Sequence, residues 1–419
     1  MSLEQRRIPR QWKTSCIVPV PKKPQPKELN DFRPVALTSH VMKTMERLII
    51  QNLRPQTRHA RDPLQFAYKE KVRVEDAITY LLHKSLSHLD GVSCAMRITF
   101  LDFSSAFNTI QPKILRHKLK EMGVDSHMMD WIVDYLTDRP QYVRLGDCRS
   151  DTVVSSTGAP QGTVLSPVLF TLYTSDFQYN SESCHVQKFA DDTAIVGCVR
   201  NGQEEEYRKL IQDFVIWCNS NYLRLNITKT KEMVVDFRRS RPHMEPVIIN
   251  GECVEQVKTY KYLGVQLDER LDWTANTDSL CRKAQSRMYF LRRLASFNVC
   301  SEMLKMFYRS VVESALFFVV ACWGGSIKKR DALRLNKLVR KAGSVVGKVL
   351  EGLTSVAERR ALSKLRSIME NPEHPLHSTI ERQRSTFSGR LLSIQCSSER
   401  MKRSMLPNAI RLYNSTART

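Results

Sequence analysis

"HVQKFADDTAIVGCV" spans residues 185–199 and places two adjacent carboxylates, Asp191 and Asp192, inside a run of β-forming residues. The pattern on either side of the acids predicts a strand over residues 185–190, a turn at the acids and a second strand over 193–199. Aspartate is a common turn residue because its side chain hydrogen-bonds the local backbone. On this pair alone, a structural turn is the simplest interpretation.

A third carboxylate ends another predicted strand. In the stretch that leads into "FLDFSSAF", the alternation of Met96, Ile98 and Phe100 indicates a strand that ends near Asp102. Hydrophobic strands that end in acids can hold several carboxylates at one edge of a sheet. Three oxygen-rich ligands suit Mg²⁺ or Mn²⁺, which prefer carboxylates and substrate phosphates. The sequence therefore predicts a divalent metal site that combines Asp102 with the adjacent pair of acids.

The composition is strongly basic. The chain has 65 Lys and Arg against 43 Asp and Glu, a net charge of +22, and residues 281–419 alone hold 27 basic and 9 acidic side chains. This charge favours polyanionic partners, with nucleic acid and an anionic membrane surface as the first candidates. An acidic metal site inside a basic protein suits phosphate chemistry on nucleic acid, for which nucleases and polymerases use two ions about 3.5–4 Å apart.

Signals for targeting and for cysteine chemistry are weak. No apolar run approaches the roughly 20 residues that span a bilayer, and "MSLEQRRIPRQWK" lacks the apolar core of a signal peptide. The 11 cysteines include no C-x-x-C pair, which indicates scattered thiols rather than a disulfide framework or a zinc ribbon. We therefore expect an intracellular protein, in the nucleus or the cytoplasm, with no membrane partner.

The order of the predicted elements indicates a mixed α+β fold. Up to about residue 275, irregularly ordered strands and helices suggest an antiparallel sheet with helices on one face rather than a βαβ barrel. After that point the pattern changes to long basic amphipathic helices, which we expect over residues 275–297, 301–323 and 329–347.

Five motifs occur in the order of the palm motifs of reverse transcriptases. They read "FLDFSSAFNTI", "STGAPQGTVLSPVLFTLYTSDF", "FADDTAIVG", "WCNSNYLRLNITKTKEMVVDF" and "YKYLGVQLD". Upstream, residues 12–49 resemble the fingers entry of the non-LTR retrotransposon branch, the long interspersed elements with their jockey-like relatives. A single motif is a weak signal, but five in order, with Asp191 lying 89 positions after Asp102, are a strong one.

The resemblance covers at least residues 11–270 and implies a right-hand polymerase. We expect fingers and palm over residues 1–275, a helical thumb over 276–350 and a basic helical C-terminal extension over 351–419. No apurinic-type endonuclease is recognisable, so we expect the chain to be a fragment of a longer element protein.

The resemblance also implies roles for the acids. Asp102 and Asp191 resemble the two principal metal ligands, Asp192 resembles the weaker third, and the backbone carbonyl of Phe103 is a further ligand for two Mg²⁺ or Mn²⁺ ions. Lys229 resembles the lysine suited to protonating pyrophosphate, although a solvated lysine is the default in so basic a chain.

Other positions resemble the nucleotide and primer sites of the family. Phe107 matches the bulky position that stacks under the incoming sugar and excludes a 2′-hydroxyl, although a core aromatic is the plain alternative. The remaining candidates are Lys22, Lys23 and Arg33 for the triphosphate, Gln161 and Gly162 for the nucleotide and template, and Leu263 and Gly264 for the primer grip.

The function implied by the resemblance is RNA-directed DNA synthesis in retrotransposition. An RNA template, a DNA primer, their hybrid and dNTPs are the expected partners, and the sequence does not indicate an oligomeric state. Two alternatives stay open: a catalytically decayed or domesticated nucleic-acid-binding protein derived from such an element, and an RNA-dependent RNA polymerase. Phe107 argues against the second, because a ribonucleotide polymerase must admit the 2′-hydroxyl.

Overall fold

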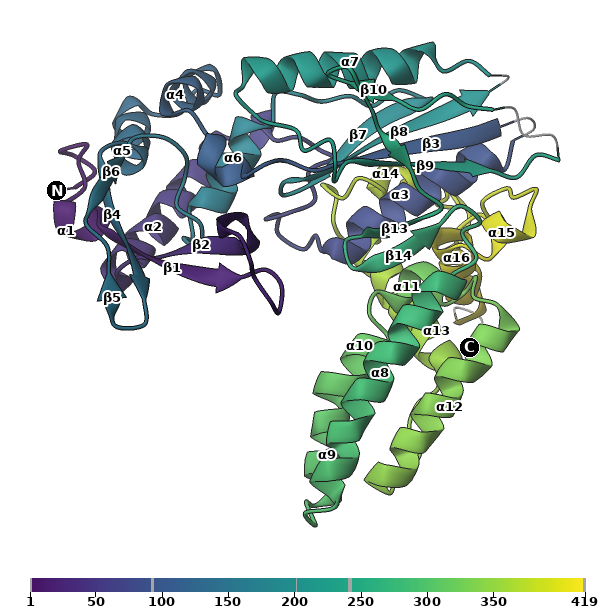
Figure 1. The fold of residues 1–419 in the computed structure, drawn as a ribbon. Coiled ribbons are helices and arrows are strands. Elements are labelled where there is room, and N and C mark those ends of the chain that lie inside the picture. Colours follow the sequence, from purple (N-terminus) through teal and green to yellow (C-terminus); the bar gives the residue numbers. More distant parts are fainter. Residues whose placement is uncertain (1, 92–93, 201, 240–242, 417–419) are drawn as a thin grey trace.

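A five-stranded sheet lies at the upper right of the molecule in Figure 1. The computed structural model describes residues 2–91, 94–200, 202–239 and 243–416. Strand β3 (Cys94–Leu101) lies between β8 and β9 and pairs antiparallel with both. The other strands of the sheet are β7 (Cys184–Phe189), β8 (Asp192–Arg200), β9 (Lys231–Asp236) and β12 (Glu255–Gln256). Only the pairing of β12 with β9 is parallel among these strands, so the predicted antiparallel sheet is confirmed.

The strand, turn and strand predicted around the two acids are also confirmed. Strands β7 and β8 pair antiparallel down to Phe189 opposite Asp192, which leaves Ala190 and Asp191 as the connecting turn. This short hairpin fixes the register of β8, and because β8 pairs with β3, it also fixes where the acids lie relative to the end of β3.

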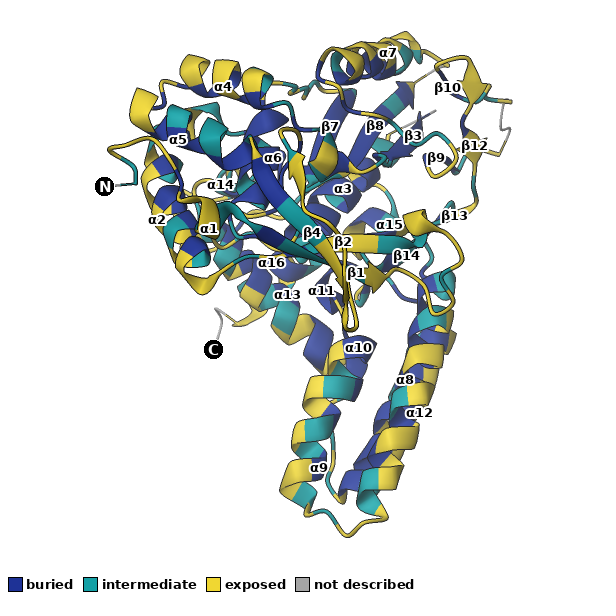
Figure 2. Cartoon of the chain, turned by 60° about the vertical axis from the view of Figure 1, so that its left-hand side comes forward, coloured by how far each residue is buried: buried dark blue, intermediate teal, exposed yellow. Residues whose placement is uncertain are grey.

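Helices cover both faces of this sheet. Helix α3 (Val74–Leu89) packs on one face, where Ile78 and Leu82 join Ile98 of β3 in one hydrophobic cluster. Helix α7 (Glu205–Ser220) packs on the other face, where Leu210 joins Ile195 of β8 in a second cluster. Figure 1 shows α7 above the sheet and α3 below it, and Figure 2 shows β3, β7 and β8 between them as mostly buried. The expectation of helices on one face is therefore wrong.

The reason for this error lies in the polar residues of β3. Arg97 and Thr99 look solvent-facing in the sequence, yet both have 0% exposure. The Arg97 guanidinium pairs with Glu232 at 2.8 Å, and the Thr99 hydroxyl hydrogen-bonds Tyr207 of α7 at 2.5 Å. A buried polar group is tolerated when it is paired in this way, so an alternating pattern does not guarantee a solvated face.

A second sheet lies at the N-terminal side, in the region predicted as fingers. Strand β1 (Ser15–Pro21) pairs antiparallel with β2 (Phe32–Leu37) and parallel with β4 (Arg139–Leu145). The predicted hairpin turn at Gly146 and Asp147 is confirmed, because it joins β4 to the short β5. The remaining elements of this region are α1 (Arg10–Lys13), α2 (His40–Gln56), α4 (Pro112–Glu121), α5 (Ser126–Leu136), α6 (Ser166–Tyr173), β5 (Cys148–Arg149) and β6 (Val153–Ser155).

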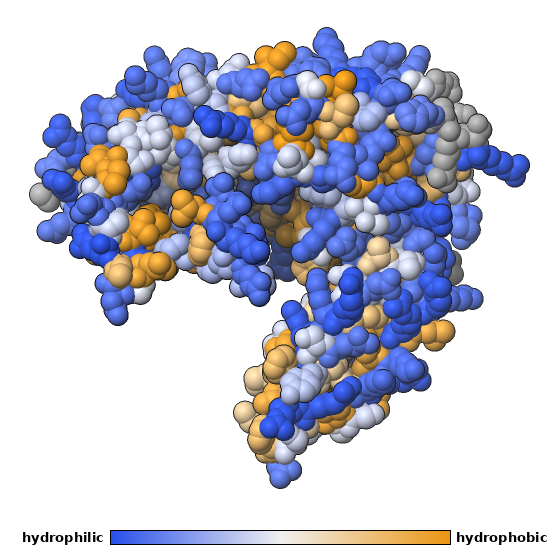
Figure 3. Space-filling view, in the orientation of Figure 1, coloured by the Kyte–Doolittle hydropathy of each residue, from blue (hydrophilic) through white to orange (hydrophobic). Residues whose placement is uncertain are grey.

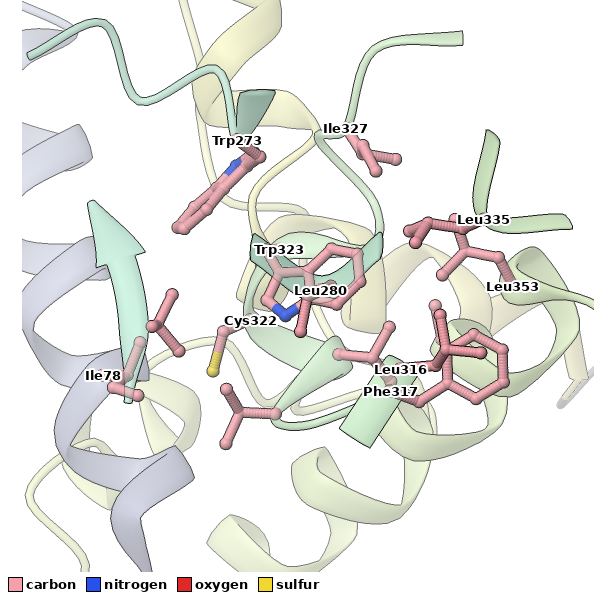
Figure 4. Packing of buried hydrophobic residues seen from close by; sticks show 14 of the residues in the cluster. Ile78, Trp273, Leu280, Leu316, Phe317, Cys322, Trp323, Ile327, Leu335 and Leu353 are labelled. Atoms are coloured by element: carbon pink, nitrogen blue, oxygen red, sulfur yellow. The ribbon is translucent and has the colours of Figure 1, made fainter. Parts of the chain in front are cut away.

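A helical arm projects from the sheet in the region predicted as thumb (Figure 1). Helices α8 (Thr274–Ala295) and α12 (Lys329–Val346) run side by side in it. A hairpin of β13 (Thr259–Tyr262) and β14 (Val265–Asp268) leads into α8. Figure 4 shows Ile78 of α3 in the same core as Leu280 of α8 and Leu335 of α12, so the arm and the sheet share one hydrophobic cluster.

The long helix predicted over residues 301–323 is interrupted, which corrects that expectation. It consists of α9 (Ser301–Phe307), a π-helical turn (Tyr308–Glu313), α10 (Ser314–Leu316) and α11 (Val320–Trp323). Val319 adopts a left-handed backbone with φ of 43°. At the break, the Phe317 carbonyl accepts a hydrogen bond from Arg360, and the Phe318 carbonyl accepts one from Trp323. These partners stabilise an interruption of the helix that helical periodicity does not reveal.

The C-terminal region folds back under the sheet. Its helices are α13 (Leu353–Met369), α14 (His377–Glu381), α15 (Glu399–Lys402) and α16 (Met405–Thr416). Leu365 and Ile410 from this region share a third hydrophobic cluster with Phe66 and with Tyr80 of α3. None of the helices in the described parts of the chain is long and apolar enough to cross a membrane.

A buried ion cluster ties the C-terminal region to α3. The Asp76 carboxylate, 1% exposed, accepts from Lys364 Nζ and pairs with His374 Nε2, each at 2.9 Å. Burial opposes ionisation of Asp76, but the hydrogen bond from His374 and the charge of Lys364 lower its pKa overall. Removal of one member would leave a buried charge with fewer partners.

Lys364→Met should therefore destabilise the whole chain. We expect a loss of roughly 3 kcal/mol in the free energy of unfolding, measured by urea denaturation. The matched control is Lys402→Met, which breaks an ion pair with Glu399 between side chains that are 52% and 78% exposed and should cost at most about 0.5 kcal/mol. Equal effects of the two variants would contradict a stabilising role for the α3–α13 contact.

Candidate active site

Three carboxylates lie at one edge of the central sheet. Asp102 directly follows β3, Asp191 lies in the β7–β8 turn and Asp192 begins β8. Because Leu101 pairs with Thr193 across the β3–β8 ladder, the end of one strand meets the start of the other. The sheet thus brings together the three acids that the sequence singled out.

The electrostatics show that these carboxylates interact. Burial raises the pKa of Asp191, the charge of Asp102 raises it further, and the charge of Arg33 opposes the shift. Partial burial of its carboxyl group, with the charges of Asp191 and Asp102, raises the pKa of Asp192 to about 6. Each charge is therefore costly in the presence of the others, and a bound cation would relieve the repulsion.

One carboxylate oxygen of Asp102 has no hydrogen bond in the part of the chain that the structure describes. Its Oδ2 atom is buried, and within the described residues no hydrogen-bond donor reaches it. The Lys229 ammonium lies 3.6 Å from this atom and is 66% exposed. Lys229 therefore lies at the acids, as a counter-ion that a metal ion could displace.

The acids offer the hard oxygen donors that Mg²⁺ and Mn²⁺ prefer. In the described part of the chain, no group of three or more His, Cys, Asp and Glu residues is gathered tightly enough to hold a metal by itself. Magnesium sites of phosphate chemistry use one or two carboxylates and take further ligands from substrate phosphates and water. The orphaned Asp102 oxygen and the raised pKa values of the other two acids fit such a site.

The loop between α7 and β9 fixes the backbone around Asp102. The Asp102 carbonyl accepts from Asn226 N at 2.8 Å, and Ser104 N donates to the Arg224 carbonyl at 2.8 Å. These bonds involve Asp102 and Ser104, the residues on either side of Phe103, and do not occupy the Phe103 carbonyl. That carbonyl stays a predicted metal ligand. The same segment carries Lys229, so its position beside Asp102 follows from the backbone pairing.

Phe107 lies against the loop that contains "APQG". Its carbonyl accepts from Ala159 N at 2.7 Å, and its ring packs on Phe170 with centroids 5.2 Å apart. The side chain is only partly buried. Phe107 therefore has both a core contact and an accessible surface. Its position is compatible with a core aromatic and with a residue that stacks under the incoming sugar.

The "APQG" loop also contacts the N-terminal sheet. The Gln161 carbonyl accepts from Ala36 N of β2 at 2.7 Å. Gly162 has a φ of 95°, and a Cβ there would lie 3.0 Å from Val35. A glycine is required by both the backbone conformation and the close approach. The loop thus joins β2, which carries Arg33, to Phe107.

The three predicted triphosphate ligands lie in different surroundings. Arg33 on β2 is exposed, and its charge acts on Asp191. Lys22 donates to the Asn30 carbonyl at 2.8 Å, and Lys23 pairs with Asp31 at 2.8 Å. The structure thus brings Arg33 within electrostatic reach of the acids and leaves the two lysines bound to the loop between β1 and β2.

Leu263 and Gly264 form the two-residue turn of the β13–β14 hairpin. Their φ values of 46° and 90° are those of a tight hairpin turn. A Cβ on Gly264 would lie 3.0 Å from Phe318, so the tip packs on the region predicted as thumb. Tyr260 of β13 stacks on Phe100 of β3 at 4.0 Å, which holds the hairpin beside the strand that ends at Asp102.

Comparison with known proteins decides the family. Residues 20–267, more than half of the chain, match the sequence profile described as reverse transcriptase (RNA-dependent DNA polymerase). The chain belongs to the reverse transcriptase family. Its mixed α+β architecture with a helical C-terminal part agrees with the expectation. A second profile, the N-terminal region of alkylated DNA repair protein alkB homolog 8, matches residues 273–314.

Individual relatives come from mobile elements. The RNA-directed DNA polymerase from mobile element jockey of Drosophila melanogaster is 25% identical over 347 residues, covering 79% of this chain and 37% of the relative. The probable RNA-directed DNA polymerase from transposon BS of the same organism is 26% identical over 300 residues, covering 68% of this chain and 33% of the relative. The chain thus spans about a third of the length of the curated relatives it matches.

Among solved structures, apo telomerase from Candida tropicalis is similar to this reverse transcriptase family member. The two are 13% identical with a TM-score of 0.45, and the match covers 88% of this chain and 69% of telomerase.

Sequence reasoning missed two side chains at the acids. Tyr260, beside Phe100, is close enough to Asp192 and Asp102 that burial and their charges raise its pKa to about 12. Gln65 hydrogen-bonds the backbone of Ala190, directly before Asp191. Neither residue stands out in the sequence, because each lies far from the acids in the sequence and approaches them only in the folded chain.

The raised pKa of Asp192 leads to a test on the metal-free protein. The folded protein raises the pKa of Asp192 to about 6, against an ordinary value of 3.8. Protonated Asp192 therefore contributes to the free energy of unfolding fully below about pH 4, and this contribution is lost as the pH rises through about 6. In EDTA at about pH 7.5, Asp192→Asn should raise the free energy of unfolding by roughly 1 kcal/mol, because exposure of the side chain weakens the full effect. Thermal unfolding across this pH range measures it, and equal curves for the two proteins at every pH would contradict it.

Proposed function

We propose that the chain is an RNA-directed DNA polymerase that extends a primer 3′-hydroxyl with dNTPs on an RNA template, in retrotransposition. The observation that carries this proposal is the edge of the sheet where Asp102, with its orphaned oxygen, meets Asp191 and Asp192 in a member of the reverse transcriptase family. The proposed regions are fingers and palm over residues 1–275, thumb over 276–350 and C-terminal extension over 351–419.

The acids would hold two Mg²⁺ or Mn²⁺ ions, with the Phe103 carbonyl as a further ligand. When bound, such ions activate the 3′-hydroxyl and stabilise the charge that develops on the transferred phosphorus and the departing pyrophosphate. Asp102 and Asp191 fix the ligand positions because they lie at the ends of paired strands. Asp192 supports them, and its pKa of about 6 means that it is ionised and able to bind a cation at neutral pH.

Basic side chains around the acids would hold the triphosphate. Arg33 is the strongest candidate, because its charge already acts on Asp191. Lys22 and Lys23 would contribute after exchanging their present loop contacts for phosphate oxygens. Lys229, beside Asp102, would donate a proton to the departing pyrophosphate.

The nucleotide and the primer would lie between two loops. Phe107 would pack under the incoming sugar, with Gln161 and Gly162 beside the base and the template. The hairpin tip at Leu263 and Gly264 would hold the primer end. Its contact with Phe318 would couple the primer to the thumb.

An RNA–DNA hybrid would occupy the hollow between the sheet-bearing body and the projecting helices, which Figure 3 shows from one side. The concentration of positive charge in residues 281–419 favours phosphate contacts there. An enzyme that copies RNA in this way would act in the nucleus or the cytoplasm.

Asp191→Asn should abolish primer extension on an RNA template. The substitution keeps the shape of the side chain but removes the charge that a divalent ion requires, so we expect a loss of roughly three orders of magnitude in rate. The matched control is Asp213→Asn on the exposed face of α7, which should keep the rate of the wild type. Primer extension with Mg²⁺ measures both variants. Unchanged synthesis by Asp191→Asn would refute the metal assignment, and binding of RNA without any synthesis by the wild type would favour a non-catalytic protein.

Phe107→Val should relax discrimination between sugars. A smaller side chain leaves room for a 2′-hydroxyl, so the ratio of kcat/KM for dNTP over rNTP should fall by about tenfold or more. Single-nucleotide addition with each substrate gives the ratio. If the ratio stays at the wild-type value while thermal stability falls, Phe107 is a core residue without a role in sugar selection.

A further inference from the structure

Ala190, the residue before Asp191, has an unusual backbone conformation. Its φ of 58° lies in the left-handed region, which residues with a Cβ rarely adopt because the Cβ crowds the backbone. Such a conformation persists only where surrounding contacts hold it. The direction of the chain at Ala190 determines where the Asp191 carboxylate points, so the contact that holds Ala190 also orients Asp191.

Gln65 provides this contact with both ends of its amide. Its Oε1 accepts from Ala190 N at 2.9 Å, and its Nε2 donates to the Ala190 carbonyl at 3.2 Å. The same Oε1 accepts from Ala67 N at 3.0 Å, which fixes the orientation of the amide. Gln65 is 4% exposed, so water competes little for these groups. An ionised glutamate has no donor and cannot form the second bond.

The segment that carries Gln65 is itself anchored to β7. Lys188 N donates to the Leu64 carbonyl at 2.9 Å, and Phe66 N donates to the Lys188 carbonyl at 2.8 Å. The Lys188 ammonium also pairs with Asp62 at 2.8 Å, and both side chains are at most 3% exposed. The segment therefore extends the sheet by a short parallel pairing two residues before the turn. Gln65 is held independently of the turn that it contacts.

We propose that Gln65 is a positioning residue that sets the metal-binding geometry of Asp191 by holding Ala190 in its left-handed conformation. The proposal rests on the proposed function of the acids. Without the amide, Ala190 relaxes toward a negative φ, the Asp191 carboxylate moves, and divalent ions bind more weakly. Template binding does not depend on this contact.

The test compares Gln65→Leu with Gln187→Leu in the full chain. Gln187 is a buried glutamine of β7 whose amide donates to the Ala77 carbonyl and the Tyr262 hydroxyl, not to the turn. Mn²⁺ binding to each protein is measured by electron paramagnetic resonance, with thermal unfolding as the measure of folding. We expect Gln65→Leu to bind Mn²⁺ about tenfold more weakly, and Gln187→Leu to keep the wild-type affinity while losing thermal stability.

A second substitution separates positioning from general damage. Glycine adopts a left-handed backbone without the steric cost, so Ala190→Gly in the Gln65→Leu background should recover Mn²⁺ affinity by roughly threefold or more. If Gln65→Leu does not fold, Gln65→Glu replaces it, because it keeps the size and one acceptor but cannot donate to the Ala190 carbonyl.

Three results would overturn the proposal: wild-type Mn²⁺ affinity in the Gln65 variant, an equal loss in Gln187→Leu, or no recovery with Ala190→Gly. Primer extension by the same proteins distinguishes this proposal from the proposed function. A wild type that binds Mn²⁺ but extends no primer would refute the polymerase function alone. Full extension by a Gln65 variant at the wild-type Mg²⁺ requirement would refute the role of Gln65 alone.

Discussion

The antiparallel pairing of β3 with β8 is the constraint on which the site depends. It brings the end of one strand to the start of the other, so that Asp102 meets Asp191 and Asp192 although Asp102 and Asp191 lie 89 positions apart in the sequence. A register shift by one residue would turn the side chains of β8 to the opposite face. The clusters under α3 and α7 oppose such a shift, because each face of the sheet packs against its own helix. The same strand register therefore both packs the core and places the acids.

Gathering three carboxylates has an electrostatic cost that the surroundings only partly offset. Arg33 and Lys229 bring positive charge to the acids from β2 and from the loop before β9, yet the pKa values of Asp191 and Asp192 stay raised. A site whose charges are not fully balanced retains a preference for added cations.

Local sequence signals predicted the parts of the fold that local physics controls. The alternation around the acids located β7 and β8, Gly146 and Asp147 marked a hairpin turn, and the basic periodic segments marked α8 and α12. Features that depend on partners distant in the sequence were missed. Buried Arg97 gives β3 a second covered face, and Arg360 and Trp323 satisfy the carbonyls exposed where a predicted long helix breaks. The three acids were predicted from their motifs, whereas Gln65 acts on a residue 125 positions away and has no signal of its own.

The central claim is that the edge of the sheet at Asp102 and Asp191 is a site for two divalent ions in the presence of substrate. The most direct measurement is anomalous X-ray scattering from crystals of the full chain with an RNA template, a DNA primer lacking its 3′-hydroxyl, an incoming dNTP and Mn²⁺. We expect two anomalous peaks about 3.5–4 Å apart between these two carboxylates and the triphosphate. A bound dNTP with no anomalous peak at either carboxylate would contradict it.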